Sequence, residues 1–433
     1  MNPWDMSTYN IQGRIHLRVT EFHKADTLIT SRNRTYYSTK NIRNKQLYFL
    51  DYGEDELAVV STSVYNEHMI NTCRYTPTMI LDYFHQKKVQ VSAHNDSSTS
   101  YQMKIDNYTV TINISNITKL LLHIEMLYDI ESDDQYYGYG DVRDSYNYSD
   151  YKRKGELQIP TNSIIEKLNG KLHDEVLLEN LQILSESIPK LETTEEPKEN
   201  VESLVEPDVT VEQYADNIHF INLHHLGTRN LIVQFSDYIF VAEAPLNSKN
   251  GKLLIEEIRK IAPNKPIKYF AFGHFYPHYT GGMRPFIHEG AKIMCTKEDQ
   301  DYVRYIADAP RTLNPDALQL EPNKLQFEEI ENQKNLSDAS QEMVIYHIGS
   351  KSKHTNDYLI YYFPKENMLF QDDLFRLRKN STKENLSKTT KGLYNAIKDL
   401  DIEVDDIVQN WSIFDKSRSM KFKFADIEKI MIE

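Results

Sequence analysis

The chain has 433 residues, which predicts two domains, because a single hydrophobic core rarely extends beyond about 250–300 residues. A formal net charge of −14 argues against duplex nucleic acid and anionic membranes as partners, since both require a basic face. No segment reaches the roughly 18–20 apolar residues of a membrane span, and two distant cysteines give no disulfide framework. The N-terminal residues MNPWDMSTYN lack signal-peptide character. We therefore expect a cytoplasmic protein, or a periplasmic or secreted one if a leader has been removed.

Residues 1–186 carry the pattern of a mostly antiparallel β domain. Apolar and polar residues alternate over 108–115, which is typical of a strand with one buried and one solvated face. Further strands are predicted over 15–19, 47–52, 57–61 and 121–127, and a helix is predicted over 76–85. A sheet of this kind needs a partner that buries its apolar face.

Residues 187–208 have the composition of a linker. The segment is rich in proline and acidic residues and has no periodic apolar face, so it cannot bury enough apolar surface to fold by itself. It separates the β-rich residues from a C-terminal domain over 209–433.

The C-terminal residues alternate between strand and helix patterns, which predicts layered α/β structure. A helix capped by Asn247 or Ser248 is expected to end before Pro263, with Arg259 and Lys260 in its last turn. Other helices are expected over 283–288, from 296 onward, and over 392–400. Strands are predicted over 217–222, 231–235, 238–242, 268–272, 292–295, 343–348, 357–363, 367–370 and 406–409.

One stretch, KPIKYFAFGHFYPHYTGGMRPFIHEGAKIMCT over 265–296, carries the strongest chemical signal. An apolar strand leads into a histidine-rich turn and a Gly-Gly pair, and a short helix and a second strand follow. Such a strand delivers metal-capable side chains to the edge of a sheet, where the glycines allow backbone segments to approach closely.

This stretch resembles the signature of the metallo-β-lactamase superfamily, His-x-His-x-Asp-His-x-Gly-Gly. Aligning the Gly-Gly pair at 281–282 places His274 on the first His of the family. The second His, the Asp and the third His of the family then fall on Tyr276, His278 and Tyr279. The resemblance implies an αββα sandwich over 209–433.

Later segments extend the resemblance. The segment ADNIHFINLHHLGTRNLIVQFSDYIFVAEAPL is similar to the opening strands of the family, HTNDYLIYYFPKENMLFQDDLF to its fourth-His strand pair, and DLDIEVDDIVQNW to its closing helix and strand. The fourth His falls on His354 and the bridging Asp on Asp373, which is also the candidate catalytic carboxylate. The last His of the family falls where this chain has Asn410 and Trp411.

The family site holds two Zn²⁺ and uses a metal-held hydroxide to attack acyl, phosphoryl or thioester centres, because zinc lowers the pKa of bound water to about 7. Here Tyr276 and Tyr279 stand at histidine positions, and a neutral phenol is a poor zinc ligand. We therefore do not expect a two-zinc centre. The residues His274, His278, His354 and Asp373 remain as ligands for one zinc or iron ion.

Two interpretations follow. In the first, the protein is a catalytically impaired or inactive superfamily member with a binding or structural role, and its histidines are relics in a pocket lined by Tyr276, Tyr279, Asn410 and Trp411. It then holds no metal, and its partner is an unidentified small molecule or protein. In the second, it is a single-metal hydrolase of an ester, lactam, thioester or phosphoester. Fold analogy does not identify the substrate.

Overall fold

The computed structural model describes residues 70–87, 89–130, 139–182, 207–375, 377, 381–411 and 421–432. It also describes the backbone of strands at 11–18, 23–30, 35–43, 46–51, 58–59 and 198–199. The chain forms two compact units. One includes Ile130–Gly140 and Val205–Glu433, and the other includes Met6–Asp129 and Asp141–Leu204. The predicted strand at 57–61 and the predicted linker at 187–208 lie mostly outside the described residues. We therefore keep both as predictions.

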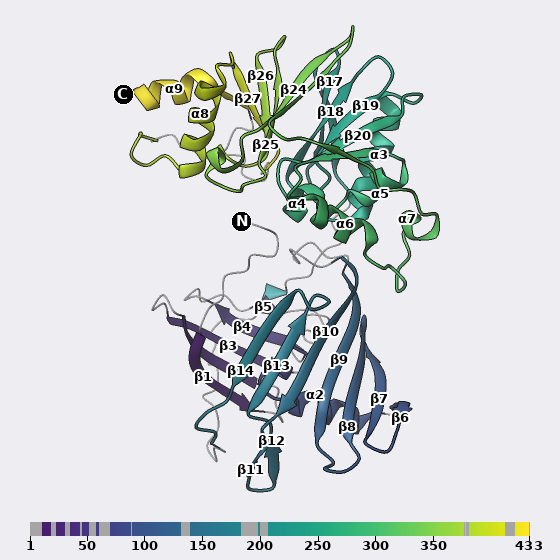
Figure 1. Cartoon of the computed structure of the whole chain (residues 1–433). Coiled ribbons are helices and arrows are strands. Elements are labelled where there is room, and N and C mark those ends of the chain that lie inside the picture. Colours follow the sequence, from purple (N-terminus) through teal and green to yellow (C-terminus); the bar gives the residue numbers. More distant parts are fainter. Residues whose placement is uncertain are drawn as a thin grey trace. The chain divides into compact units, whose positions relative to one another are not determined.

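The N-terminal unit is built mostly from antiparallel strand pairs (Figure 1). One sheet has the order β1 (Ile11–Arg18), β2 (His23–Thr30), β3 (Thr35–Arg43) and β4 (Gln46–Asp51). A seven-stranded sheet has the order β14 (Leu172–Leu177), β13 (Asn162–Lys167), β10 (Gly140–Ser149), β9 (Leu121–Ile130), β8 (Tyr108–Ser115), β7 (Ser98–Ile105) and β6 (Gln90–His94). Two short pairs are also described: β11 (Lys152–Lys154) with β12 (Leu157–Ile159), which is antiparallel, and β5 (Ala58–Val59) with β15 (Lys198–Glu199), which is parallel.

The helix α2 (Thr78–Gln86) supplies the apolar partner of the seven-stranded sheet. Its Ile80 and Phe84 belong to one buried cluster with strand residues such as Val110, Ile112 and Ile124. The short 3₁₀ turn η2 (Thr72–Arg74) adds the buried Cys73 to the same cluster. Both the alternation over 108–115 and the helix predicted over 76–85 are therefore found in the structure.

The C-terminal unit contains two mixed sheets. The first has the order β16 (Val209–Ala215), β17 (Ile218–Leu223), β18 (Thr228–Gln234), β19 (Ile239–Ala242), β20 (Ile267–Ala271), β21 (Lys292–Cys295) and β22 (Phe327–Glu329). The second has the order β23 (Gln333–Ser337), β24 (Glu342–His347), β25 (Leu359–Phe363), β26 (Met368–Gln371), β27 (Asp406–Gln409) and β28 (Lys421–Lys423). Parallel pairing runs from β19 to β22 and joins β26 to β27.

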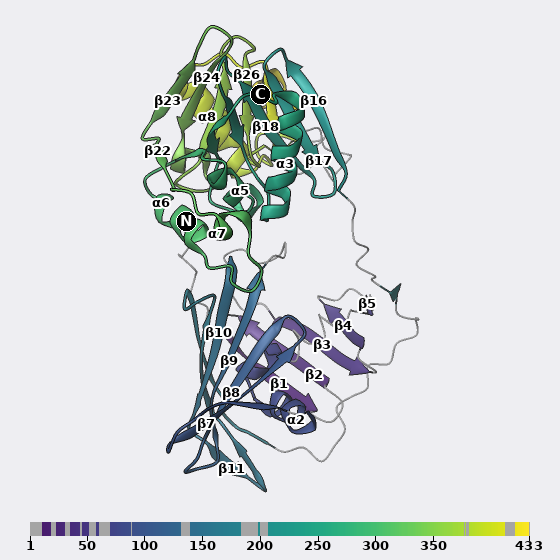
Figure 2. The ribbon, with the colours of Figure 1, turned by 90° about the vertical axis from the view of Figure 1, so that its right-hand side faces the viewer.

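Buried clusters show four layers in this unit. Phe220 of the first sheet stacks on Phe370 of the second, with 5.8 Å between ring centroids, in a core that lies between the sheets. The other face of the first sheet packs against α3 (Ser248–Ile261), α5 (Arg284–His288) and α6 (Gln300–Asp308). The other face of the second sheet packs against α8 (Lys388–Leu400) and α9 (Phe424–Ile432). Figure 1 shows these helices on opposite sides of the sheets, and Figure 2 views the unit from the side of α3 and α5.

The layers confirm the predicted αββα sandwich and the antiparallel β character of the N-terminal residues. Period-2 alternation explains the layers, because successive side chains of a strand point to opposite faces. In β25, Tyr361 joins the core between the sheets, whereas Ile360 and Tyr362 face α8 and α9. None of the described helices is long and apolar enough to cross a membrane.

Local chemistry fixes the elements around the histidine-rich turn. The side chain of Asn247 accepts hydrogen bonds from the backbone N–H groups of Lys249 and Asn250, and so caps α3 as predicted. The turn itself contains a helix that was not predicted, α4 (Pro277–Thr280). A Cβ atom at Gly281 would lie 2.1 Å from the Leu246 carbonyl oxygen, so only glycine permits this close approach.

Candidate metal centre

The carboxyl ends of buried strands carry most of the site residues. Glu243 follows β19, and His274 lies three residues beyond the end of its parallel neighbour β20. Asp372 and Asp373 follow β26, whose parallel neighbour β27 is followed by Asn410. The first residue of β25 ties the two sheets together here, because Leu359 N donates to the Gly273 carbonyl at 2.7 Å. Loops at such strand ends are the usual place for ligands in α/β folds.

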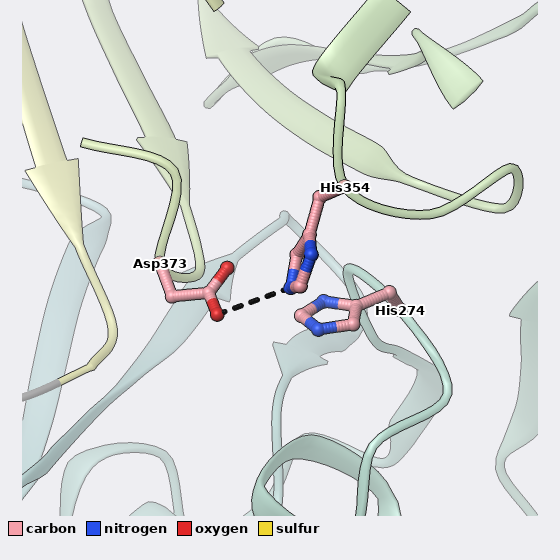
Figure 3. Close-up of side chains that lie close together, drawn as sticks. All are labelled: His274, His354 and Asp373. Atoms are coloured by element: carbon pink, nitrogen blue, oxygen red, sulfur yellow. Dashed lines mark ion pairs between the residues drawn. The ribbon is translucent and has the colours of Figure 1, made fainter. Parts of the chain in front are cut away.

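Three of the predicted ligands come together. One possible ligand atom from each of His274, His354 and Asp373 lies within 4.8 Å of the other two. The side chains point toward one another in Figure 3, where His354 Nε2 lies 3.4 Å from Asp373 Oδ2. His274 is completely buried, and the other two side chains are mostly buried. The geometry therefore brings two imidazoles and one carboxylate to a single point.

Asp372 orients His274. Its Oδ2 lies 2.8 Å from His274 Nδ1, so a proton on Nδ1 leaves the lone pair on Nε2. Burial lowers the pKa of His274, and the nearby Asp373 and Asp357 offset only part of this effect, so the ring is neutral at neutral pH. His274 Nε2 is buried and has no hydrogen-bond partner among the described residues. A neutral imidazole with a free Nε2 is suited to metal ligation.

A second buried carboxyl lies behind Asp372. Glu243 Oε1 accepts a hydrogen bond from Gly273 N at 2.8 Å, and the Glu243 backbone has a φ of 76°, which is strained for a residue with a side chain. Burial and the proximity of Asp372 raise the pKa of Glu243, and burial likewise raises the pKa of Asp372. Both carboxyls therefore hold a proton more readily than an exposed carboxyl does. Gly273 is required here, because a Cβ atom would lie 2.1 Å from Asp372 Oδ2.

The backbone before His354 places the second imidazole. The 3₁₀ turn η3 (Gly349–Ser352) ends at Lys353, whose φ of 58° is left-handed. Ser352 Oγ accepts from His354 N at 3.1 Å and donates to the Thr355 carbonyl at 3.1 Å. In the part of the chain that the structure describes, the buried His354 Nε2 makes no hydrogen bond. Its contact with Asp373 Oδ2, at 3.4 Å, is longer than a usual hydrogen bond.

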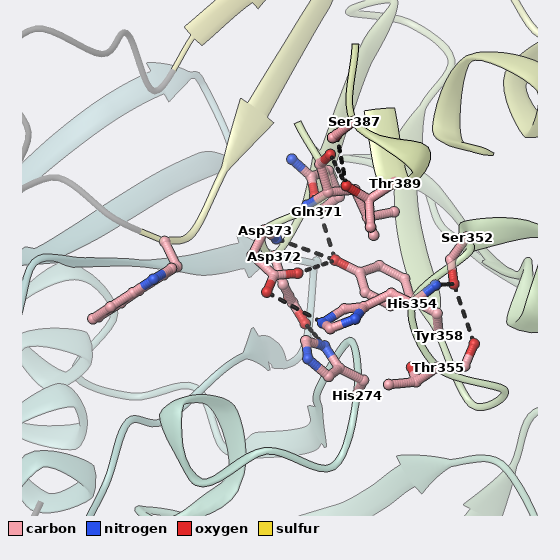
Figure 4. A network of polar contacts seen from close by, with 12 residues as sticks. His274, Ser352, His354, Thr355, Tyr358, Gln371, Asp372, Asp373, Ser387 and Thr389 are labelled. Atoms are coloured by element: carbon pink, nitrogen blue, oxygen red, sulfur yellow. Dashed lines mark hydrogen bonds and ion pairs between the residues drawn. The ribbon is translucent and has the colours of Figure 1, made fainter. Parts of the chain in front are cut away.

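Asp373 is held by Tyr358. The Tyr358 hydroxyl donates to Asp373 Oδ1 at 3.2 Å and accepts from Asp373 N at 3.1 Å, as Figure 4 shows. Burial raises the pKa of Asp373, but the neighbouring His354, His274 and Tyr358 outweigh it and leave the pKa below its usual range. Asp373 is therefore a carboxylate at neutral pH.

The remaining predicted site residues lie around this group. The rings of Tyr276 and Tyr279 have centroids 4.7 and 4.6 Å from that of His274. His278 is not in the three-residue group: it lies in α4, and its ring centroid is 4.8 Å from the ring of Trp411. Asn410 is fully buried and donates from Nδ2 to the Arg229 carbonyl at 2.8 Å, so it ties β27 to β18.

Sequence reasoning did not identify Asp372, Glu243 or Tyr358. Two signals were present in the sequence: a double acid after the buried strand at 367–370, and an acid after the buried strand at 238–242. No local pattern marks Tyr358, because its role depends on contacts with residues that are distant in sequence.

Neither a protein-family model nor a curated protein sequence matches this chain. Solved metallo-β-lactamases match its C-terminal half. The enzyme from Pontibacter korlensis covers 52% of this chain and 98% of its own length, at 11% identity and a TM-score of 0.38. The metallo-β-lactamase DIM-1 covers 52% and 96%, at 14% identity and a TM-score of 0.37. FIM-1 from Pseudomonas aeruginosa, solved in a mono-zinc form, covers 52% and 93%, at 15% identity and a TM-score of 0.37. At these identities the likeness concerns the fold alone.

Proposed function

We propose that the C-terminal unit is a single-metal hydrolase whose ion is held by His274, His354 and Asp373. One observation carries the proposal: the two Nε2 atoms are buried, have no hydrogen-bond partner among the described residues, and converge with one carboxylate. A buried polar atom left unpaired costs about 1–3 kcal/mol. A cation bound between the three side chains would remove that cost for His274 Nε2 and would replace the long contact of His354 Nε2 with Asp373.

The donor set fits such an ion. Two imidazoles and a carboxylate are a ligand set of catalytic zinc sites, which keep a further position for water or substrate, and they also suit Fe²⁺. When bound, such an ion supplies an activated water for attack on an ester, lactam, thioester or phosphoester. Two features of the protein prepare these ligands for an ion. Asp372 fixes the tautomer of His274, and Asp373 stays ionised.

The test is the metal content of the protein together with hydrolysis of nitrophenyl esters, nitrophenyl phosphodiesters and a chromogenic lactam. Elemental analysis should find about one zinc or iron ion per chain, and His354→Ala should lose both the ion and the hydrolysis. His288→Ala is the matched control, because His288 contacts the Glu321 carbonyl and is not one of the three ligands. Wild-type protein without a stoichiometric ion would contradict the proposal.

A second function is favoured by the aromatic surroundings of His274. The ring of Tyr358 stacks on His274 with centroids 4.9 Å apart, and the rings of Tyr276 and Tyr279 lie tilted against it at 4.7 and 4.6 Å. If these rings occupy the volume that an ion and its water need, the protein is a catalytically inactive binding or structural protein. Its partner is then a small molecule or another protein. Wild type and His354→Ala would then behave alike in every assay with metal.

A further inference from the structure

We propose that Tyr358 is a positioning residue that makes Asp373 a one-oxygen ligand and fixes the plane of His274. The inference rests on the proposed single-metal site and adds a residue that sets its affinity and geometry. Tyr358 precedes β25 and is completely buried. Its ring lies beside those of His274 and His354, with centroids 4.9 and 6.1 Å away, and its hydroxyl bonds Asp373.

The first contact fixes the imidazole plane. The rings of Tyr358 and His274 are 4.9 Å apart with 19° between their planes, so they are nearly parallel. Asp372 holds the same imidazole at its Nδ1 edge, at 2.8 Å. A ring that is stacked on one face and hydrogen-bonded at one nitrogen has little freedom to rotate. Its Nε2 therefore stays directed at the same point.

The second contact gives the two carboxylate oxygens of Asp373 different partners. The Tyr358 hydroxyl has one proton and two candidate acceptors, Asp373 Oδ1 at 3.2 Å and Gln371 Oε1 at 3.4 Å. Gln371 Oε1 already accepts from Leu374 N at 2.8 Å, so the carboxylate is the better acceptor. With Oδ1 taken by the phenol, Oδ2 is the oxygen that faces His354. Tyr358 thus prepares Asp373 to bind an ion through Oδ2.

A neighbouring tyrosine provides the matched control. Tyr361 lies in β25, is also completely buried, and has a hydroxyl without a hydrogen-bond partner among the described residues. Its ring packs in the core between the two sheets. Tyr361→Phe removes the same oxygen as Tyr358→Phe from the same region, but it removes no contact with a proposed ligand.

The experiment measures Zn²⁺ affinity, by competition with a chromophoric chelator, and the visible spectrum of the Co²⁺-loaded protein. Tyr358→Phe should bind Zn²⁺ about 10 to 100 times more weakly than wild type, which is the usual effect of removing a group that holds a metal ligand. The cobalt bands should also change, because the carboxylate is no longer restricted to one oxygen. Tyr361→Phe should match wild type in both measurements, and thermal unfolding of the metal-free variants should verify their folding.

If Tyr358→Phe does not fold, a ¹⁹F label that leaves the tyrosine side chain in place can test the same contact. With 3-fluorotyrosine at position 358 or 361, the ¹⁹F resonance at 358 should move on addition of Zn²⁺ and saturate at one ion per chain, whereas the resonance at 361 should not move. Wild type that binds Zn²⁺ with an unmoved 358 resonance, or a folded Tyr358→Phe with wild-type affinity and cobalt spectrum, overturns this inference and leaves the single-metal site standing. Wild type that binds no metal overturns both.

Discussion

At the scale of single residues, Asp299 shows how burial affects a carboxyl of the C-terminal unit. Asp299 is buried, and its Oδ2 accepts a hydrogen bond from Thr296 Oγ1 at 2.8 Å. Asp357 is also buried; its Oδ2 accepts from Phe275 N at 2.9 Å, and its Oδ1 has no partner among the described residues. Burial is the main reason that the pKa of Asp299 is raised, and the charge of Asp357 raises it further.

This raised pKa predicts how Asp299→Asn changes stability with pH. A carboxyl whose pKa is higher in the folded state than in the unfolded state contributes stability below the unfolded pKa of about 4, and that stability is lost as pH rises through the folded pKa. Asparagine does not ionise, and its amide can donate to Asp357 Oδ1. The variant should therefore gain stability relative to wild type as pH rises, by about 1–3 kcal/mol at pH 8.

Urea unfolding at pH 5 and pH 8 measures this difference. Asp301→Asn is the control, because the Asp301 side chain is 93% exposed and its pairing with Arg304 contributes little. A stability difference between Asp299→Asn and wild type that stays the same at both pH values would show that Asp299 does not titrate as described.

At the scale of elements, one buried arginine joins three helices. Arg284 begins α5 and donates from Nε and Nη2 to the two carboxylate oxygens of Asp316, at 2.6 and 2.9 Å. Asp316 caps α7 (Ala317–Leu320) by accepting from Gln319 N. Arg284 Nη1 donates to the carbonyls of Ile306 and Ala307 in α6. This arginine is 1% exposed, so its charge depends entirely on these partners.

Arg284→Ala should therefore destabilise the C-terminal unit by about 3–5 kcal/mol, because it leaves several carbonyls unpaired and, among the described residues, leaves the mostly buried Asp316 with only the longer ion pair to Arg311, at 3.5 Å. Arg304→Ala, which removes an exposed arginine of α6 paired with Asp301, should cost about 1 kcal/mol or less. Urea unfolding of the two variants gives both numbers. A cost for Arg284→Ala as small as that for Arg304→Ala would show that the helices do not depend on this charge.

The elements also show how far sequence reasoning reaches. The alternation over 108–115 and the capping side chain of Asn247 act locally, and both predicted the observed structure. The helix α4 has four residues, too few to show a helical period, so the direction of His278 could not be predicted. The bond between His274 and Asp372 joins residues 98 positions apart. The motif alignment predicted four ligands for one ion, and three of them, His274, His354 and Asp373, come together without His278. Only the folded chain shows what holds these three.

At the scale of the whole molecule, the two compact units have separate buried clusters. α2 and the seven-stranded sheet share one cluster, and the layers of the αββα sandwich share three others. We propose, from composition alone, that residues 187–208 form the linker between the two units. Units with separate cores are expected to unfold in separate transitions.

Zn²⁺ should then stabilise one transition and leave the other unchanged, because a ligand stabilises only the folded state to which it binds. At a free Zn²⁺ concentration 100 times the Kd, the gain in stability is about 2.7 kcal/mol, and each kcal/mol raises the Tm of a unit of about 200 residues by roughly 2–4 °C.

The chain has two tryptophans, Trp4 and Trp411, and Trp411 belongs to the C-terminal unit. In a Trp4→Phe background, tryptophan fluorescence therefore follows that unit alone, while circular dichroism follows both. The fluorescence transition should rise in temperature with Zn²⁺, the other transition should stay in place, and His354→Ala should abolish the rise. If both transitions moved together with Zn²⁺, the two units would unfold as one cooperative structure.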